Sequence, residues 1–282
     1  MASSPQATLL SEAHRAQQQQ ENVRVALTVQ QFWSIVQAND LERTGRLWLA
    51  ALLPRLRDHH RRKMQLTRGY YEAFRAVEFA AAMSPRPAAP AAAPRPGAGG
   101  QPQRDRPAPF VMPTLPTAPE LNVEQMQTSL AATGLWTYRE KMRVSVPEPR
   151  ARQDAVVASI GAATRILTND VHEALERDTK ADPAAVGYVR VVRANGCSFC
   201  AMLASRGPVY KDDSFDFSDP RFVGNGSHKV HDHCNCSLEP VFSRSAPWPG
   251  ESKQWQDLWN SATKGLSGQA ALNAFRRAYE GR

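Results

Sequence analysis

The chain has 282 residues and a formal net charge of +8, with 42% hydrophobic and 22% charged residues, a balance that predicts a folded protein rather than a disordered one. No apolar run approaches the roughly 20 residues of a membrane-spanning helix, and residues 1–20 lack the apolar core of a signal peptide. We therefore expect a soluble protein without a membrane partner, which stays in the compartment where it is made.

The first 83 residues predict a helical module. Apolar residues recur at helical spacing, and the first stripe consists of Leu27, Phe32, Ile35 and Val36. Asp40 is a suitable N-cap for a second helix, and Pro54 is expected to kink that helix or end it at Leu53. A third helix should follow, with an apolar side formed by Leu56, Met64, Leu66, Tyr70, Phe74 and Val77.

A basic cluster opens the third predicted helix and consists of Arg55, Arg57, His59, His60, Arg61, Arg62 and Lys63. At helical spacing these side chains surround most of the helix, which is typical of a solvated face. The alternative is a non-specific nucleic-acid contact, because a surplus of positive charge attracts phosphates without reading a sequence. In that case we predict that Arg61, Arg62 and Lys63 contact DNA.

Residues 84–120 predict a linker. Eleven of the 21 prolines fall between Pro85 and Pro119, in a stretch that is also rich in Ala, Gly and Arg. Such a composition cannot bury enough apolar surface to offset chain entropy, and its Pro-Ala spacing favours a semi-rigid, polyproline-like spacer. The end of the linker, Phe110 to Pro113, is more apolar, and we expect it to dock on the next domain.

Residues 121–282 predict a second folded part. Asn122 and Gln125 form a capping-box pattern, and Gly134 stands where a C-cap glycine would end the helix. A longer helix is predicted from about Arg152 to Thr179 by its apolar spacing.

The pattern then changes to short β-branched runs, which predict strands over 187–192 and 238–242. A short helix is expected between Cys197 and Gly207, and helices return from Lys253 to Arg282. The predicted fold class is α+β. It comprises an N-terminal helical module (1–83), a Pro/Ala-rich linker (84–120), and a C-terminal domain (121–282) of helices plus a small sheet, with a Cys/His knot at 197–236.

The four cysteines all lie between Cys197 and Cys236. In a protein that is not secreted, such clustering argues for a metal or a reactive thiol rather than a disulfide framework. Two thiols separated by two residues, Cys197 and Cys200, have the spacing that grips one tetrahedral ion. His231, Cys234 and Cys236 offer further ligands about thirty residues later. Zinc is the expected metal, in a structural role, because thiolate and imidazole ligands together suit it.

The ligand set stays open at this point. One set combines Cys197, Cys200 and His231 with one of the second pair of cysteines, and the other uses all four thiolates. His233 and His228 are in reserve. The alternatives to a metal are four small buried thiols packed without an ion, and thiol chemistry. A thioredoxin-like redox role is disfavoured because no βαβ pattern surrounds the Cys-x-x-Cys motif.

The order of these features resembles the C-terminal part of phage Mu F-like minor head proteins, and in particular the version that tailed phages of actinobacteria encode next to the portal gene. The likeness covers about Val186 to Phe242. Its parts are a strand, Cys-x-x-Cys, a short helix ending in Gly207, Pro208-Val209-Tyr210, His-x-x-Cys-x-Cys and a strand ending in Pro240-Val241-Phe242. Weaker similarity extends back to about Met112. Where many Mu F-like proteins have His-Pro-x-Cys-Arg-Cys, this chain has His231-Asp232-His233-Cys234-Asn235-Cys236.

The resemblance implies a minor capsid protein in phage head morphogenesis. Such a protein acts near the portal during assembly, with the portal, scaffold or major capsid protein as its partners and with DNA nearby. It would be found in the host cytoplasm during assembly and then in the virion capsid. Proteins of this kind are also often named capsid maturation proteases, so cleavage of capsid or scaffold protein is the alternative function that the resemblance implies.

The residues themselves give the protease alternative no assigned catalytic group. No Gly-x-Ser-x-Gly elbow occurs. A cysteine protease would need Cys197 or Cys200 as the thiolate and His231 or His233 as the base. A zinc protease would need three ligands and an open position for water, whereas thiolate-rich zinc sites are mostly structural. Virion assembly by binding is therefore the primary prediction, and whether the chain is also a peptidase is left open.

Overall fold

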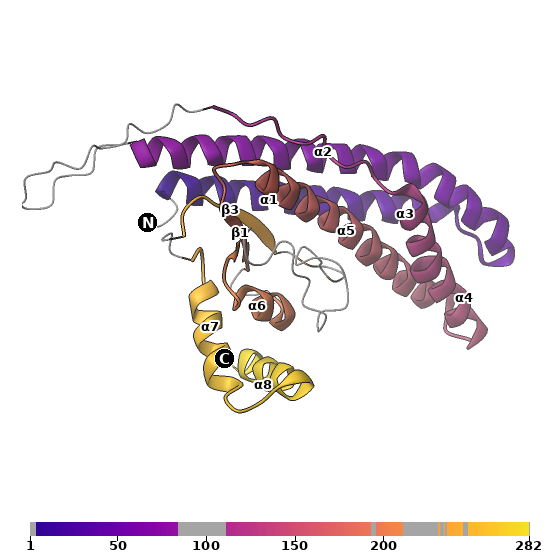
Figure 1. Cartoon of the computed structure of the whole chain (residues 1–282). Helices are drawn as coiled ribbons and strands as arrows, with labels where there is room; N and C mark the ends of the chain where they lie inside the picture. The colour runs from indigo at the N-terminus through magenta and orange to yellow at the C-terminus, as the bar shows by residue number, and fades with distance from the viewer. Residues whose placement is uncertain are drawn as a thin grey trace, which may run out of the picture.

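The computed structural model describes residues 4–83, 111–192, 196–210, 231, 234, 236–244 and 248–281. Long helices dominate it, and a small antiparallel sheet stands beside them, so the predicted α+β class is confirmed. Figure 1 shows α1 (Pro5–Phe32) and α2 (Leu41–Met83) side by side, with α5 (Glu148–Ala181) packed along them. These three helices form the body on which the rest of the described chain is arranged.

Helix α2 runs through Pro54 without a break, so the expected end at Leu53 is wrong. Pro54 itself is exposed, while Leu52, Leu53 and Leu56 on either side of it are buried. Proline removes one backbone hydrogen bond from a helix, but its ring faces solvent here and the buried leucines hold the next turn in place. The second and third predicted helices are therefore one helix.

Helix α3 (Val123–Leu130), a π-helical turn (Ala131–Leu135) and α4 (Trp136–Arg143) follow one another directly. Asn122 caps α3 as predicted, because its Oδ1 accepts a hydrogen bond from the backbone nitrogen of Gln125 at 2.9 Å. Gly134 is not a C-cap but lies inside the π-helical turn. A Cβ there would come within 2.1 Å of Ser159 Oγ, so the glycine allows α5 to approach closely.

The largest hydrophobic core is built from both sides of the predicted linker. Trp33, which follows α1, packs edge-on against Trp48 of α2 at 4.7 Å between ring centroids and against Tyr138 of α4 at 6.2 Å. Ile166 and Leu167 of α5 belong to the same cluster. The N-terminal helices thus share their core with α3, α4 and α5 instead of enclosing one of their own.

Helix α2 also holds the segment that precedes α3. Met112 Sδ lies 3.8 Å from the Arg75 guanidinium, Arg68 donates to the Pro116 carbonyl, and Leu115 packs against a buried cluster of α1, α2 and the sheet. The prediction that the linker end docks on the next domain is therefore wrong in part, because Met112 and Pro116 contact the N-terminal module. Phe110 lies outside the described residues.

The sheet has the order β2-β1-β3, with β1 (Gly187–Val191) between β2 (Val209–Tyr210) and β3 (Ser237–Val241), and both pairings are antiparallel. It is tied to the long helices by polar contacts. Ser11 of α1 donates to the buried Glu239 carboxylate at 2.7 Å, and Arg75 of α2 pairs with the buried Asp182 carboxylate, just before β1, at 2.6 Å. The sheet thus rests against α1 and α2.

Three short helices form a C-terminal lobe: α6 (Ser198–Ala204), α7 (Ser252–Ala262) and α8 (Gly268–Glu280). Figure 1 shows them on the side of the sheet that faces away from α1 and α2. Trp255, Phe275 and Tyr279 pack there on α6 and on the cysteines. Gly207, with φ +75°, allows the chain to turn after α6. It also packs against the Trp248 ring, with which a side chain at this position would clash.

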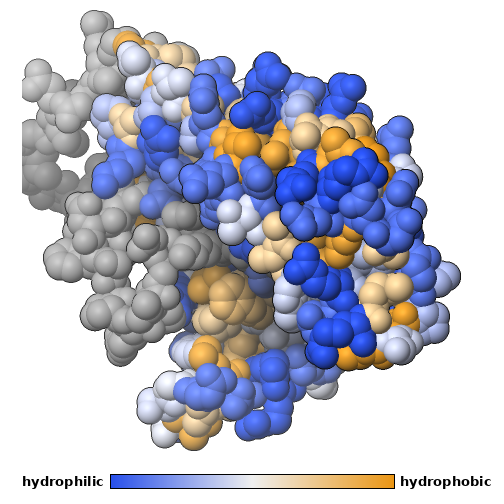
Figure 2. Space-filling view, turned by 90° about the vertical axis from the view of Figure 1, so that its right-hand side faces the viewer, coloured by the Kyte–Doolittle hydropathy of each residue, from blue (hydrophilic) through white to orange (hydrophobic). Residues whose placement is uncertain are grey.

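The domain boundaries 1–83, 84–120 and 121–282 remain a prediction. The two folded parts contact each other through the shared hydrophobic cores. Within the described ranges, no helix combines the length and the apolar character that crossing a membrane requires. Figure 2 shows a surface on which hydrophilic residues predominate, with smaller hydrophobic areas among them.

Candidate metal centre

The pairing of β1 with β3 brings the two predicted ligand clusters together. Val191, the last residue of β1, pairs with Ser237, the first residue of β3. Cys197 and Cys200 follow β1, whereas Cys234 and Cys236 precede β3, so both clusters lie at the same end of the antiparallel pair. The convergence of the two clusters therefore follows from strand register.

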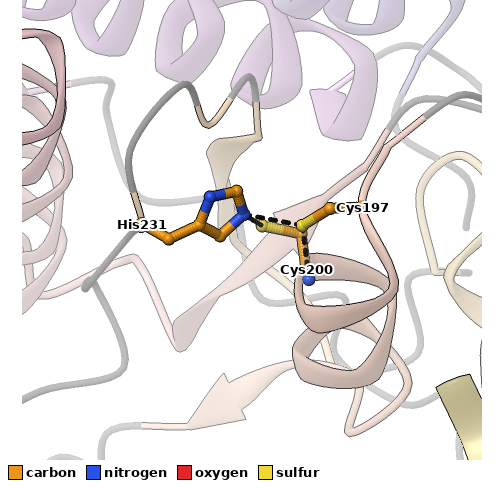
Figure 3. Close-up of side chains that lie close together, drawn as sticks. All are labelled: Cys197, Cys200 and His231. Carbon is orange, nitrogen blue, oxygen red and sulfur yellow. Dashed lines mark hydrogen bonds between the residues drawn. The ribbon is translucent and has the colours of Figure 1, made fainter. Parts of the chain in front are cut away.

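The first group of potential ligands is Cys197, Cys200 and His231. Cys197 is the N-cap of α6, and its Sγ accepts a hydrogen bond from the backbone nitrogen of Cys200 at 3.3 Å. Figure 3 shows the His231 imidazole pointing at both sulfurs. Its Nε2 lies 2.7 Å from Cys197 Sγ and 3.9 Å from Cys200 Sγ.

The second group is Cys200, Cys234 and Cys236, and all three are buried. Cys234 Sγ lies 3.1 Å from Cys200 Sγ and 3.0 Å from Cys236 Sγ. None of the four cysteines is in a disulfide. The two groups share Cys200, which makes it the central residue of the site.

Hydrogen bonds divide the four thiols into two kinds. The pKa of Cys197 is lowered to about 4 by its hydrogen bonds with Cys200 and with the neighbouring imidazole, against the opposing effect of partial burial. Burial also opposes the ionisation of Cys236, but hydrogen bonds from Cys200 and Cys234 and the positive charge of a neighbouring guanidinium hold its pKa well below the ordinary value. The pKa of Cys200 is raised by its bonds to the other three sulfurs. The hydrogen bonds thus favour ionisation at Cys197 and Cys236 and oppose it at Cys200.

The residues fit a tetrahedral thiophilic ion. A zinc–sulfur bond of about 2.3 Å gives a tetrahedron whose edges are about 3.8 Å, and each group of three donors lies within 4.8 Å. Sulfurs at 3.0–3.1 Å are well beyond the disulfide bond length of about 2.05 Å but closer together than the edge of this tetrahedron, so the donors would separate by roughly 0.7 Å to hold an ion. An ion here would take the place of the shared thiol protons.

Residues from the body and the lobe surround the sulfurs. His172 of α5 places Nε2 3.2 Å from the Cys236 carbonyl oxygen, and Arg190 of β1 donates from Nη1 to Cys236 Sγ at 2.7 Å. On the lobe side, Tyr279 donates to the Gly196 carbonyl at 2.5 Å. The site therefore lies at the junction of α5, β1 and the C-terminal lobe.

Sequence reasoning named the sulfurs and His231 but missed Arg190 and His172. A signal for Arg190 is present in the sequence, because it stands between Val189 and Val191 in an otherwise apolar strand, where an arginine needs a nearby negative charge. No sequence signal marks His172, which lies on α5 about sixty residues before the second cysteine pair. His228 and His233, the reserve ligands, lie outside the described residues.

The three residues predicted to contact DNA do not share one exposed face. Arg61 is well exposed and pairs with Asp58 at 2.6 Å, and Arg62 is half-exposed and pairs with Glu21 at 2.9 Å. Lys63 is buried, 1% exposed, and donates to Asn22.

The interpretation of the whole basic cluster as a solvated face is therefore wrong in part. His59 and His60 are buried along with Lys63, because this side of α2 packs against α1 and α5. His59 Nδ1 donates to the Glu21 carboxylate of α1 at 2.6 Å, and His60 lies 3.2 Å from the Asp170 carboxylate of α5.

The fold and this site define an α+β protein with a buried cysteine–histidine centre that has the donors to hold a metal ion. The chain belongs to the VG15 protein family, which matches residues 102–262, more than half of its length. VG15 is a family of phage proteins, and the chain is accordingly a virion-related phage protein. Neither a curated protein nor a solved structure matches the chain. The matched range contains α3, α4, α5, the sheet and the cysteine–histidine centre, whereas α1 and α2 precede it.

Proposed function

We propose that the chain is a minor capsid protein that acts near the portal during assembly of the phage head. Membership of a phage protein family supports this, and so does the resemblance of residues 186–242 to Mu F-like head proteins. The proposed partners are the portal, scaffold or major capsid protein, with weak non-specific DNA contact through exposed arginines in addition.

The single observation that carries the proposal is the buried position of the cysteine–histidine centre. Cys200, Cys234 and Cys236 face the hydrophobic core of the C-terminal lobe, where Trp255 and Phe275 pack. An ion at such a position holds chain segments together, and thiolate-rich sites of this kind are mostly structural. This arrangement favours a structural component over a metal-dependent hydrolase.

We propose zinc as the ion, because thiolate and imidazole donors in tetrahedral geometry suit it. Cys197 and Cys200 would hold it from α6, and His231, Cys234 or Cys236 from the segment before β3. When bound, zinc supplies a cross-link between these segments, and its binding free energy contributes to folding. A stable lobe beside the long helices would then present a defined surface to the assembling head.

The association is tested by co-expressing the full chain with the phage's portal, scaffold and major capsid proteins and sedimenting the assembled particles. We expect the chain to sediment with the particles and to leave the other proteins at full length. The matched comparison is a particle assembled without the portal, from which the chain should be largely missing. Failure to sediment with any of the three proteins would contradict the proposed role.

One contact favours the alternative of a capsid maturation protease. Cys197 is half-buried and its sulfur lies 2.7 Å from His231 Nε2, the arrangement of an activated cysteine nucleophile. The same co-expression separates the two functions. If the chain is a protease, the capsid or scaffold protein is shortened, and Cys197→Ala abolishes the cleavage while particle association persists.

A further inference from the structure

Arg190 is a buried cation in the middle of the sheet. It lies in the central strand β1 and is 4% exposed, between Val189 and Val191, which are also buried. A guanidinium keeps its charge under all ordinary conditions, so burial removes its hydration without removing the charge. Such a group is stable only where negative charge or acceptors face it.

The strand register places this cation next to the cysteines. Arg190 pairs with Leu238 of β3, and Cys236 comes two residues before Leu238, on the same face of the sheet and diagonally opposite Arg190. Arg190 Nη1 donates to Cys236 Sγ at 2.7 Å, the separation of a charge-assisted hydrogen bond.

The charge of the proposed centre explains why an arginine is useful there. A zinc ion with three thiolates and one imidazole carries one negative charge in total, and with four thiolates it carries two. Either centre is anionic, and Cys200, Cys234 and Cys236 are all buried. In a water-poor site this negative charge destabilises the bound state unless a cation lies nearby.

We propose that Arg190 is the counter-charge of the metal centre and that it acts through its hydrogen bond to Cys236, one of the ligands. This inference rests on the metal centre proposed above. Arg190 positions and polarises a ligand and does not itself touch the ion. It belongs to the surrounding residues that orient ligands and tune affinity in metal sites.

The coupling between Arg190 and the ion has two consequences, of which the first is reciprocal. Removing Arg190 weakens zinc binding, and removing zinc lowers the contribution of Arg190 to stability. A second consequence is spectroscopic. A hydrogen bond to a coordinated thiolate withdraws electron density from the sulfur, so its loss makes the sulfur-to-metal charge-transfer transition of a cobalt-substituted centre easier and moves the band to longer wavelength.

The experiment uses the full chain with Arg190→Met, which keeps most of the side-chain volume, and Arg190→Lys, which keeps the charge. Zinc affinity is measured by competition with a chromophoric chelator, and cobalt(II) is used for the absorption spectrum. We expect Arg190→Met to bind zinc roughly 10–100-fold more weakly than the wild type, as for other residues that support metal ligands. Arg190→Lys should lose less, and the cobalt band of Arg190→Met should move to longer wavelength.

Arg75→Met is the matched control. Arg75 is equally buried and pairs with the Asp182 carboxylate at 2.6 Å, away from the cysteines. We expect this variant to melt at a lower temperature with unchanged zinc affinity.

The possible outcomes distinguish a failure of the metal centre from a failure of the role assigned to Arg190. A wild-type chain that binds no zinc refutes the metal centre and this inference with it. A wild type that binds zinc, with Arg190→Met binding it equally well or showing an unmoved cobalt band, overturns the role of Arg190 and leaves the metal centre standing. If Arg190→Met does not fold, Arg190→Lys supplies the test. Zinc binding weaker than in Arg75→Met, with a cobalt band at longer wavelength, supports the proposal, whereas a zinc affinity and a cobalt band that both equal those of Arg75→Met contradict it.

Discussion

Removing α1 and α2 should prevent the remainder of the chain from folding stably. In the full chain, the N-terminal helices cover Val171, Leu175, Tyr188 and Leu238, which cluster with residues of α1 and α2. None of these four side chains is more than 5% exposed. The fragment 121–282 keeps all four but loses the surfaces that bury them.

The magnitude follows from the buried side chains. Exposing one fully buried side chain costs about 1.5–3 kcal/mol, so the four together cost about 6–12 kcal/mol. A typical domain is stable by only about 5–15 kcal/mol. The fragment also loses the buried ion pair between Arg75 and Asp182, because Arg75 lies on α2. This loss adds to the free-energy cost. We therefore expect the fragment to unfold or aggregate on its own.

The assay begins with limited trypsin digestion of the full chain. We expect the first cuts at Arg86, Arg95, Arg104 or Arg106, in the Pro-rich segment. The two products should still elute together from a size-exclusion column and separate only in denaturant. A recombinant 121–282 fragment that elutes as a monomer and unfolds cooperatively at the midpoint of the full chain would refute this reasoning. First cuts inside α5 would refute the predicted linker as well.

Three further predictions concern single side chains. Gly134→Ala should destabilise the chain by about 1–3 kcal/mol in denaturant unfolding, because its Cβ would meet Ser159 Oγ at 2.1 Å. The control is Gly69→Ala, where a Cβ would meet nothing within 4 Å, and it should stabilise α2 by about 0.5–1 kcal/mol. Burial acts to raise the pKa of Glu21, but hydrogen bonds from His59 and two arginines lower it from 4.5 to about 2. The ionised Glu21 therefore contributes stability that is present above pH 4.5 and lost as the pH falls towards 2, so Glu21→Gln should melt less steeply with falling pH over that window. An equal slope in both proteins would contradict this. Arg61→Glu, at an exposed position, should weaken non-specific DNA binding without lowering the melting temperature, and binding that persists in high salt would count against an electrostatic contact.

Elements with an uninterrupted pattern were predictable from the sequence. The helix expected from Arg152 to Thr179 is α5, Glu148–Ala181, and the expected strands 187–192 and 238–242 are β1 and β3 within one residue at each end. These segments are either long and periodic or short and β-branched, so local spacing alone determines them. The convergence of Cys197 and Cys200 with the later cluster was predictable for the same reason, since it follows from pairing two recognisable strands.

Helix α1 shows where spacing alone is insufficient. Apolar residues lie on more than one side of it, and Leu27, placed in the predicted apolar stripe, is 60% exposed, whereas Val25 and Val29 are buried. Which side faces the core depends on α2 and α5, and no local pattern contains that information.

Buried polar residues were the other failure. Lys63 and the neighbouring histidines were read as a solvated surface because charge normally predicts exposure. In the structure Lys63 bonds to Asn22 of α1, and burial lowers its pKa to about 8. Arg190 was missed for a related reason. Its partner Cys236 is 46 residues away along the chain, so only the tertiary structure reveals the pair.

If a metal ion holds the cysteine–histidine centre together, native mass spectrometry of the full chain, purified without chelator, should detect it. We expect a native mass that exceeds the denatured mass by one zinc ion, and the loss of this excess in Cys200→Ser, because Cys200 belongs to both groups of donors. A native mass equal to that of the bare chain, together with a Cys200→Ser variant that melts like the wild type, would refute the metal centre and leave the four cysteines as packed thiols.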